Sequence, residues 1–249
     1  MSKKHFNAIS CQYDELRGIH PPLLERLVSE AKITNNSRVL DVGCGTGADL
    51  FWLREATRAD VMGIDASEKM ASIARARLGS HCAMRGNAEV LLTGFRAEFD
   101  VVLFKLSLQH FPDPGQVLNP AVSVLKDGGR LAVVTARSND LKSFPIHGYF
   151  PELDRSMAEV ADSLHQVLVN TPFRRLRRWQ QVEVELMHER CDESLLERVK
   201  QRYLSPLRLL SDEELRIGIS RIERDLESDQ LNGIRSVRGT IYLTQKESA

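Results

Sequence analysis

Short apolar runs alternate with helix-like segments through the first half of the chain. Four of these runs are rich in valine and nearly continuous, as is typical of strands buried on both faces of a parallel sheet. The segments between them repeat apolar residues every three or four positions, which is the spacing of one helix face. The pattern therefore predicts a βαβ series. The four runs span residues 39–42, 61–64, 101–104 and 131–134.

The second half of the chain begins with a clear boundary and then changes pattern. Gly128 and Gly129 are expected to end the third helix just before the strand at 131–134. Residues 182–186 and 240–244 alternate apolar and polar side chains, as expected of antiparallel strands near a sheet edge. These features predict an α/β fold with a Rossmann-like, doubly wound sheet of seven strands, parallel except for an antiparallel terminal strand.

Two helical and loop segments fall outside this sheet, over residues 138–180 and 192–236. The first contains an aromatic and proline-rich stretch at 144–151, and the second is highly charged. We interpret both as additions to one domain that spans residues 1–249, because a chain of this length does not require a second core.

Charge and composition narrow the range of partners. The chain carries 34 Lys plus Arg and 34 Asp plus Glu residues, so no net field favours nucleic acid or an anionic membrane. No run approaches the roughly 18 apolar residues of a membrane span, and the first ten residues lack the apolar core of a secretory signal. We therefore expect a cytoplasmic protein, a monomer or homodimer, and we do not expect nucleic acid as its partner. Cys11, Cys44, Cys82 and Cys191 form no metal-ligand spacing, so no metal or disulfide framework is expected.

The sharpest local signal is the sequence Asp-Val-Gly-Cys-Gly-Thr-Gly at residues 41–47, where the first strand runs into a helix. Glycines at 43, 45 and 47 permit a tight turn and the close approach of a ligand. Because Ala48 follows, the loop also satisfies the dinucleotide pattern G-x-G-x-x-G/A. The loop alone therefore leaves the cofactor open.

Two carboxylates favour one cofactor class. Asp65, at the end of the second strand, is placed to accept hydrogen bonds from a ribose diol, which either cofactor has. Asp41 lies two positions before the first glycine, where it would repel a pyrophosphate and attract an ammonium or a sulfonium. We therefore expect a cofactor that is cationic near the glycine loop.

With these motifs the chain resembles the class I S-adenosylmethionine-dependent methyltransferases, in the small-molecule group similar to methyltransferase type 11. The resemblance covers about residues 6–135 and rests on segments 41–47, 63–67, 86–89, 99–111 and 125–131. It implies S-adenosyl-L-methionine as cofactor and S-adenosyl-L-homocysteine as product, with an N-terminal helical lid over residues 1–30 and the two additions on the acceptor side. The cofactor residues it implies are Tyr13, Asp41, Gly43, Cys44, Gly45, Gly47, Asp65, Ala66, Met70, Asn87, Ala88, Lys105, Leu106 and His110.

The chain departs from the family pattern at three positions. Asn87 stands where an aspartate is more usual, although an amide oxygen still accepts a hydrogen bond from an adenine amino group. Lys105 replaces a small polar residue, and Gln109 replaces a histidine. Lys105 either points to solvent or binds an acidic acceptor. The departures at Lys105 and Gln109 affect the expected chemistry of the acceptor more than the identity of the cofactor.

Methyl transfer from a sulfonium is a direct displacement, so the protein mainly aligns acceptor and donor and excludes water. An O, N or C acceptor in a small biosynthetic metabolite is expected, and a general base helps an acceptor of high pKa. His110 is the first candidate base, because it follows the fourth strand at the edge where ligands bind. His147 is the second. Gln109, His147 and Tyr149 are the candidate acceptor contacts.

Three alternatives remain open. An NAD-dependent oxidoreductase would use the same glycine loop and Asp65. A catalytically silent partner subunit that binds S-adenosylmethionine is suggested by Lys105 and Gln109. An RNA methyltransferase rests only on the arginine-rich run at 174–179, for which a solvated face is the better interpretation at zero net charge.

Overall fold

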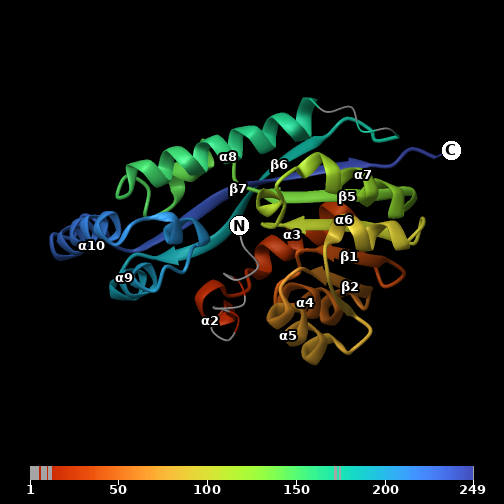
Figure 1. Cartoon of the computed structure of the whole chain (residues 1–249), viewed down its shortest axis with the longest axis horizontal. Helices are drawn as coiled ribbons and strands as arrows, with labels where there is room; N and C mark the ends of the chain where they lie inside the picture. Colours follow the sequence, from red (N-terminus) through yellow and green to blue (C-terminus); the bar gives the residue numbers. More distant parts are fainter. Residues whose placement is uncertain (1–5, 7–9, 11–12, 171–172, 174, 249) are drawn as a thin grey trace. The chain divides into compact units, whose positions relative to one another are not determined.

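The computed structural model describes residues 6, 10, 13–170, 173 and 175–248. Most of the first twelve residues, including Cys11, and Arg174 of the arginine-rich run lie outside the described residues. The chain divides into two compact units. The prediction that residues 1–249 form a single domain stays a prediction. Figure 1 shows the whole chain. Unit 1 comprises Met1–Thr135, Leu164–Val182 and Thr240–Ala249, and unit 2 comprises Ala136–Ser163 and Glu183–Gly239.

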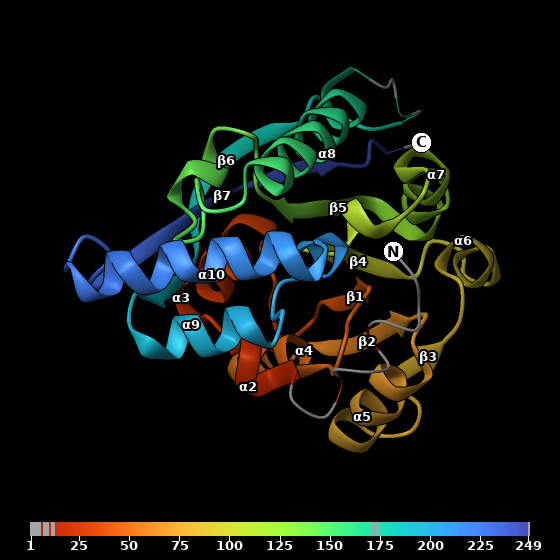
Figure 2. The same cartoon turned by 60° about the vertical axis from the view of Figure 1, so that its left-hand side comes forward.

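The predicted seven-stranded sheet is confirmed, with the strand order β3-β2-β1-β4-β5-β7-β6. The neighbours from β3 to β5 pair in parallel, and β7 is antiparallel to β5. Figure 2 shows β3, β2, β1, β4 and β5 in this order across unit 1. The strands are β1 Arg38–Val42, β2 Asp60–Asp65, β3 Ala83–Arg85, β4 Phe99–Lys105, β5 Leu125–Thr135, β6 Gln180–Arg190 and β7 Ile234–Gln245.

Helices cover both faces of the sheet in unit 1. Leu40 and Val102 share one apolar core with α6, α7 and the last turns of α8, while their neighbours Val39 and Val101 are buried on the opposite face. On that face α4 packs against α3, α5 and β2 (Figure 1). This double burial explains why these strands read as continuous apolar runs. The helices of unit 1 are α2 Tyr13–Arg17, α3 Pro21–Ala31, α4 Ala48–Thr57, α5 Glu68–Leu78, α6 Ala88–Leu91 and α7 Pro114–Val124, with short 3₁₀ turns η1 Leu92–Gly94 and η2 Leu108–His110.

The structure corrects the predicted start of β5. The helix α7 ends at Val124, and β5 begins at once with Leu125, so Gly128 and Gly129 lie inside the strand. Leu125 pairs with Phe99, after which the register shifts and the regular ladder resumes further along β5. The glycines therefore serve an irregularity in the strand rather than a helix end, and Gly128 has the left-handed φ of 78° that such a bulge requires.

Unit 2 contains most of the two segments that were predicted as additions, while residues 164–180 belong to unit 1. Their place on the acceptor side stays a prediction. Unit 2 contains η3 Asp140–Ser143, α9 Glu193–Lys200, η4 Ser205–Leu209 and α10 Asp212–Glu227, while α8 Pro151–Asn170 begins in unit 2 and ends in unit 1. Ser211 and Glu214 form a reciprocal capping box at the start of α10. Phe150 packs so closely on Gly218 of α10 that no side chain fits at that glycine. The aromatic stretch is therefore partly core of unit 2.

Across the described part of the chain, no helix combines the length and the apolar character that a membrane span needs. The cysteines in that part, Cys44, Cys82 and Cys191, are free thiols.

Candidate functional site

A pocket of about 310 Å³ opens in unit 1 at the carboxyl ends of β1, β2 and β4. Its volume lies at the lower end of the range of small-molecule sites, about 300–1,000 Å³. From the N-terminal segment and the first two strands, the predicted cofactor residues that line it are Tyr13, Gly43, Gly45, Asp65, Ala66 and Met70. From the rest of the sheet they are Asn87, Ala88, Lys105, Leu106 and His110.

The glycine loop forms one wall of this pocket. Gly43 has a φ of 84°, and a Cβ there would stand 2.5 Å from the Cβ of Ser107 in the turn after β4. The Ser107 hydroxyl in turn donates a hydrogen bond of 2.6 Å to the carbonyl of Val42. The end of β1 and the turn after β4 are thus in direct contact, which only glycine at position 43 permits. Sequence reasoning missed Ser107. Its position just after β4, at the same sheet edge as the first glycine, would have indicated a residue at the site.

Two other loop residues were predicted to contact the cofactor but are not among the described lining residues. Gly47 packs against α5, because a Cβ at this position would stand 3.1 Å from the Cβ of Ala74 in that helix. The Cys44 sulfur fills the space beside Gly63, and its burial raises the pKa of the Cys44 thiol well above its usual value. Gly47 and Cys44 therefore pack the loop against α5 and β2 rather than lining the pocket.

Asp65 fastens the glycine loop to the end of β2. Its Oδ2 accepts a hydrogen bond of 2.9 Å from the amide of Gly45, and its Oδ1 accepts one of 2.8 Å from the amide of Ser67. Burial raises the pKa of Asp65, and these two amide donors oppose that shift. Ser67 also caps α5 by accepting from the amide of Met70. Each carboxylate oxygen keeps a further lone pair for a ligand on the pocket side.

Asp41 is a buried carboxyl group behind the loop, with only 4% of its surface exposed. Its Oδ1 has no hydrogen-bond partner among the described residues, and Asp41 is not among those that line the pocket. Burial, followed by the nearby charge of Asp49, raises its pKa from 3.8 to about 8, while Lys105 opposes the shift. Asp41 is therefore held mainly in its neutral, protonated form at neutral pH.

Lys105, at the end of β4, is paired with a carboxylate inside the protein. Its Nζ lies 2.8 Å from Oδ2 of Asp49 in α4, and the two side chains are 14% and 24% exposed. The alternative that Lys105 points to solvent is therefore wrong. Because Asp49 already neutralises its ammonium group, Lys105 would attract an acidic acceptor less strongly than an unpaired lysine would.

The turn after β4 carries a strained residue and two predicted acceptor-side residues. Leu106 has a φ of 53°, a conformation that side chains other than glycine adopt at a cost. The Gln109 amide nitrogen donates a hydrogen bond of 2.9 Å to the Leu106 carbonyl, whereas its buried Oε1 has no hydrogen-bond partner among the described residues. Gln109 is not among the described lining residues, while His110 lines the pocket with its ring 5.4 Å from that of Phe6.

The short helix α2 is tied to the glycine loop through Asp14. Its Oδ1 accepts from the hydroxyl of Thr46 at 2.5 Å, and its Oδ2 accepts from Nη2 of Arg77 at 2.6 Å. Next to Asp14, the Tyr13 ring comes within 3.8 Å of the position that a Cβ on Gly45 would take. Sequence reasoning placed Tyr13 at the site but missed Thr46 and Arg77. No local signal marks Arg77, which lies far from this loop in sequence.

The other two predicted acceptor contacts belong to unit 2. His147 is exposed, with its Nδ1 3.3 Å from a carboxylate oxygen of Asp154. The Tyr149 hydroxyl donates a hydrogen bond of 2.6 Å to Asp225, and burial, together with this bond, raises the pKa of Tyr149. Neither residue is among the described residues that line the pocket, so their role at an acceptor stays a prediction.

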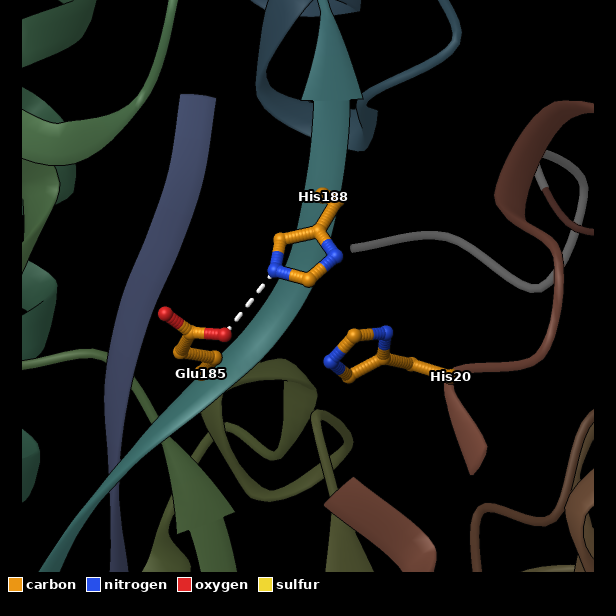
Figure 3. A group of neighbouring side chains, drawn as sticks. All are labelled: His20, Glu185 and His188. Carbon is orange, nitrogen blue, oxygen red and sulfur yellow. Dashed lines mark hydrogen bonds and ion pairs between the residues drawn. The ribbon is translucent and has the colours of Figure 1, made fainter. Parts of the chain in front are cut away.

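A histidine and a glutamate also meet on β6 in unit 2. His188 Nε2 and Glu185 Oε2 lie 2.9 Å apart, and both side chains are exposed (Figure 3). Figure 3 also labels His20, which belongs to unit 1 and stands at the N-cap position of α3.

Comparison with known proteins decides the family. The family model described as "Methyltransferase domain" matches residues 33–201, which is more than half of the chain. The chain belongs to this methyltransferase family. Membership of this family favours the methyltransferase interpretation of the glycine loop over the nicotinamide-dependent one.

Among relatives, a ubiquinone biosynthesis O-methyltransferase of Bordetella avium is 36% identical over 137 residues, which cover 53% of this chain and 56% of that protein. The chain thus spans little more than half the length of this curated relative. A crystal structure of a putative methyltransferase from an antibiotic biosynthesis pathway of Anabaena variabilis has the same fold, with a TM-score of 0.72 at 16% identity over 93% of this chain and 99% of that one. A phosphoethanolamine N-methyltransferase of Haemonchus contortus, solved with S-adenosylhomocysteine, has a TM-score of 0.57 at 15% identity over 100% of this chain and 61% of that one.

Proposed function

We propose that this methyltransferase-family protein binds S-adenosylmethionine in the pocket of unit 1 and transfers the methyl group to O, N or C of a small-molecule acceptor. S-adenosylhomocysteine is then the product. The observation that carries the proposal is a pocket lined by the glycine loop and by Asp65, which holds that loop in place. Behind the loop, a buried carboxyl oxygen of Asp41 has no hydrogen-bond partner among the described residues. A cationic ligand beside this carboxyl group would favour its ionised form, whereas a pyrophosphate would disfavour it.

The residues present fit this cofactor along its length. The strand order β3-β2-β1-β4 brings the turn after β3, the end of β2, the glycine loop and the end of β4 into one row. Asn87 of the first turn would contact the adenine, and Asp65 would accept from the ribose hydroxyls. The amino-acid end would lie between Gly43 and Lys105. Asn87 Oδ1 already accepts from the amide of Glu89 at 3.0 Å and keeps one lone pair for the adenine.

The charge of the pocket supports a sulfonium rather than a dinucleotide. Among the described lining residues, Lys105 is the one lysine or arginine, and it is paired with Asp49. A pyrophosphate carries two negative charges and needs backbone amides or free cations to hold it. Here the amides of Gly45 and Ser67 are occupied by Asp65. A phosphate-free nucleoside with a cationic tail therefore suits the site better.

When bound, S-adenosylmethionine supplies an activated methyl group on a positively charged sulfur. The chain has to orient the acceptor, exclude water and, for an acceptor of high pKa, remove a proton. His110 is the candidate base within the pocket, with Phe6 beside its ring. His147 in unit 2 remains the second candidate, and the relative named for ubiquinone biosynthesis supports a small metabolite as acceptor.

Isothermal titration calorimetry with S-adenosylhomocysteine tests the proposal. Asp65→Asn is expected to weaken binding by about tenfold, because a charge-assisted hydrogen bond contributes roughly 1.5 kcal/mol or more. The matched control is Asp60→Asn, the same substitution at the other, exposed end of β2. Equal affinities for the wild type and both variants would remove Asp65 from the site, and NADH binding in the same cleft would restore the oxidoreductase.

A second assay separates an active enzyme from a silent subunit. Methyl-labelled S-adenosylmethionine is incubated with the protein and fractionated metabolite extracts. We expect label in at least one small-molecule fraction. Label in none of them, together with intact binding of S-adenosylhomocysteine, would favour the silent subunit, and label in RNA would favour the RNA methyltransferase.

A further inference from the structure

Arg77 joins three segments of unit 1 that are far apart in sequence. Its Nη2 donates to Oδ2 of Asp14 at 2.6 Å, and its Nη1 donates to the carbonyl of Thr46 at 3.0 Å and to the Thr46 hydroxyl at 3.1 Å. The Thr46 hydroxyl itself donates to Oδ1 of Asp14. The last turn of α5, the glycine loop and α2 therefore meet in one closed network of hydrogen bonds.

This network differs from an ordinary surface ion pair. Both carboxylate oxygens of Asp14 are occupied, and Thr46 is only 2% exposed. The side chains of Arg77 and Asp14 are 28% and 38% exposed, so water screens them only in part. Isolated exposed pairs contribute little to stability, but a shared network with buried members contributes more than its separate pairs.

The network also gives α2 a polar contact with the rest of unit 1. A helix of five residues is too short to be stable alone, so its position depends on tertiary contacts. Leu16 supplies one, because it is buried at 8% exposure, and Asp14 supplies the polar one. Tyr13, adjacent to Asp14, lines the pocket beside Gly45.

We propose that Arg77 and Thr46 are positioning residues that hold Tyr13, through Asp14, against the cofactor pocket. This inference rests on the proposed binding of S-adenosylmethionine. Arg77 is not among the described lining residues, so its effect on the ligand passes through Asp14 and Tyr13. The same contacts link the shape of the glycine loop at Thr46 to the position of α2, so the loop and α2 form one binding surface.

The test is a double-mutant cycle on S-adenosylhomocysteine affinity, measured by calorimetry for Arg77→Met, Tyr13→Ala and the double variant. Arg77→Met and Tyr13→Ala are each expected to weaken binding about tenfold, and the double variant is expected to bind no more weakly than Tyr13→Ala alone. Arg75→Met is the matched control, because Arg75 lies on the same helix and pairs with Glu68 instead. It should leave the affinity unchanged.

Two results would overturn the inference. Wild-type affinity in Arg77→Met would show that the network does not hold the ligand-binding position of Tyr13. Losses that multiply in the double variant would show that Arg77 acts through the fold at large. Asp14→Ala breaks the network from the α2 side and carries the same expectation if Arg77→Met does not fold. A wild-type protein that binds no S-adenosylhomocysteine would instead refute the proposed function, which is a separate outcome.

Discussion

Asp41→Asn is expected to stabilise the ligand-free protein. The pKa of Asp41 is raised from 3.8 to about 8 in the folded state. Each pH unit between these two values costs about 1.4 kcal/mol of folding free energy, so the penalty at pH 7 is about 4 kcal/mol. The new amide donors of asparagine are buried in the same place and cost about 1–3 kcal/mol if unpaired. The net gain is then about 1–3 kcal/mol.

The stability difference between Asp41→Asn and the wild type should depend on pH in one direction. Because the folded pKa is the higher one, the favourable contribution of protonated Asp41 is complete below 3.8 and is lost as the pH rises to about 8. The variant has no such titration. Its advantage over the wild type should therefore grow between pH 5 and pH 8 by about 1.4 kcal/mol per pH unit and stay constant above pH 8.

Urea unfolding of both proteins at pH 5, 6, 7, 8 and 9 measures this difference. Asp113→Asn is the control, because Asp113 is an exposed N-cap of α7 and asparagine caps a helix equally well. A variant that is less stable than the wild type at pH 8, or a difference that does not change with pH, would refute the reasoning. The same variant should bind S-adenosylmethionine more weakly, since asparagine cannot ionise when the cationic ligand binds.

Three further predictions follow from the site. Gly43→Ala should lower the unfolding free energy by about 2–4 kcal/mol in urea titrations, more than Gly148→Ala, which has a similar φ of 88° but no neighbour within 4 Å. Lys105→Met should cost about 1–3 kcal/mol in the same assay by leaving Asp49 unpaired, and adding Asp49→Leu should recover most of it. His110→Gln should slow methyl transfer by about 10²-fold or more, a larger loss than the loss in S-adenosylhomocysteine affinity; an unchanged rate would exclude His110 as the base.

The features that sequence analysis predicted well are those fixed by local chemistry. Buried strands such as β1 and β4 read directly as apolar runs, and the glycines at 43, 45 and 47 mark a turn that other residues adopt only with strain. β3 was not assigned to any residues, because a three-residue strand is too short to show a period. Gly128 was interpreted as a helix end, although a left-handed φ serves a strand bulge equally well.

The features that sequence analysis missed depend on contacts between distant segments. Nothing near Lys105 indicates that Asp49 will meet it, and nothing near Arg77 indicates Asp14. The burial that raises the pKa of Asp41 likewise comes from the packing of several elements. Sequence analysis therefore identified the residues that touch the pocket better than those that hold them in place.

A crystal structure of the protein grown with S-adenosylhomocysteine is the most direct measurement of the central claim. We expect electron density for the ligand in the pocket of unit 1, with the ribose hydroxyls within hydrogen-bond distance of the Asp65 carboxylate and the amino-acid end between the glycine loop and Lys105. Density for the ligand elsewhere on the chain, with this pocket empty at saturating ligand, would contradict the account.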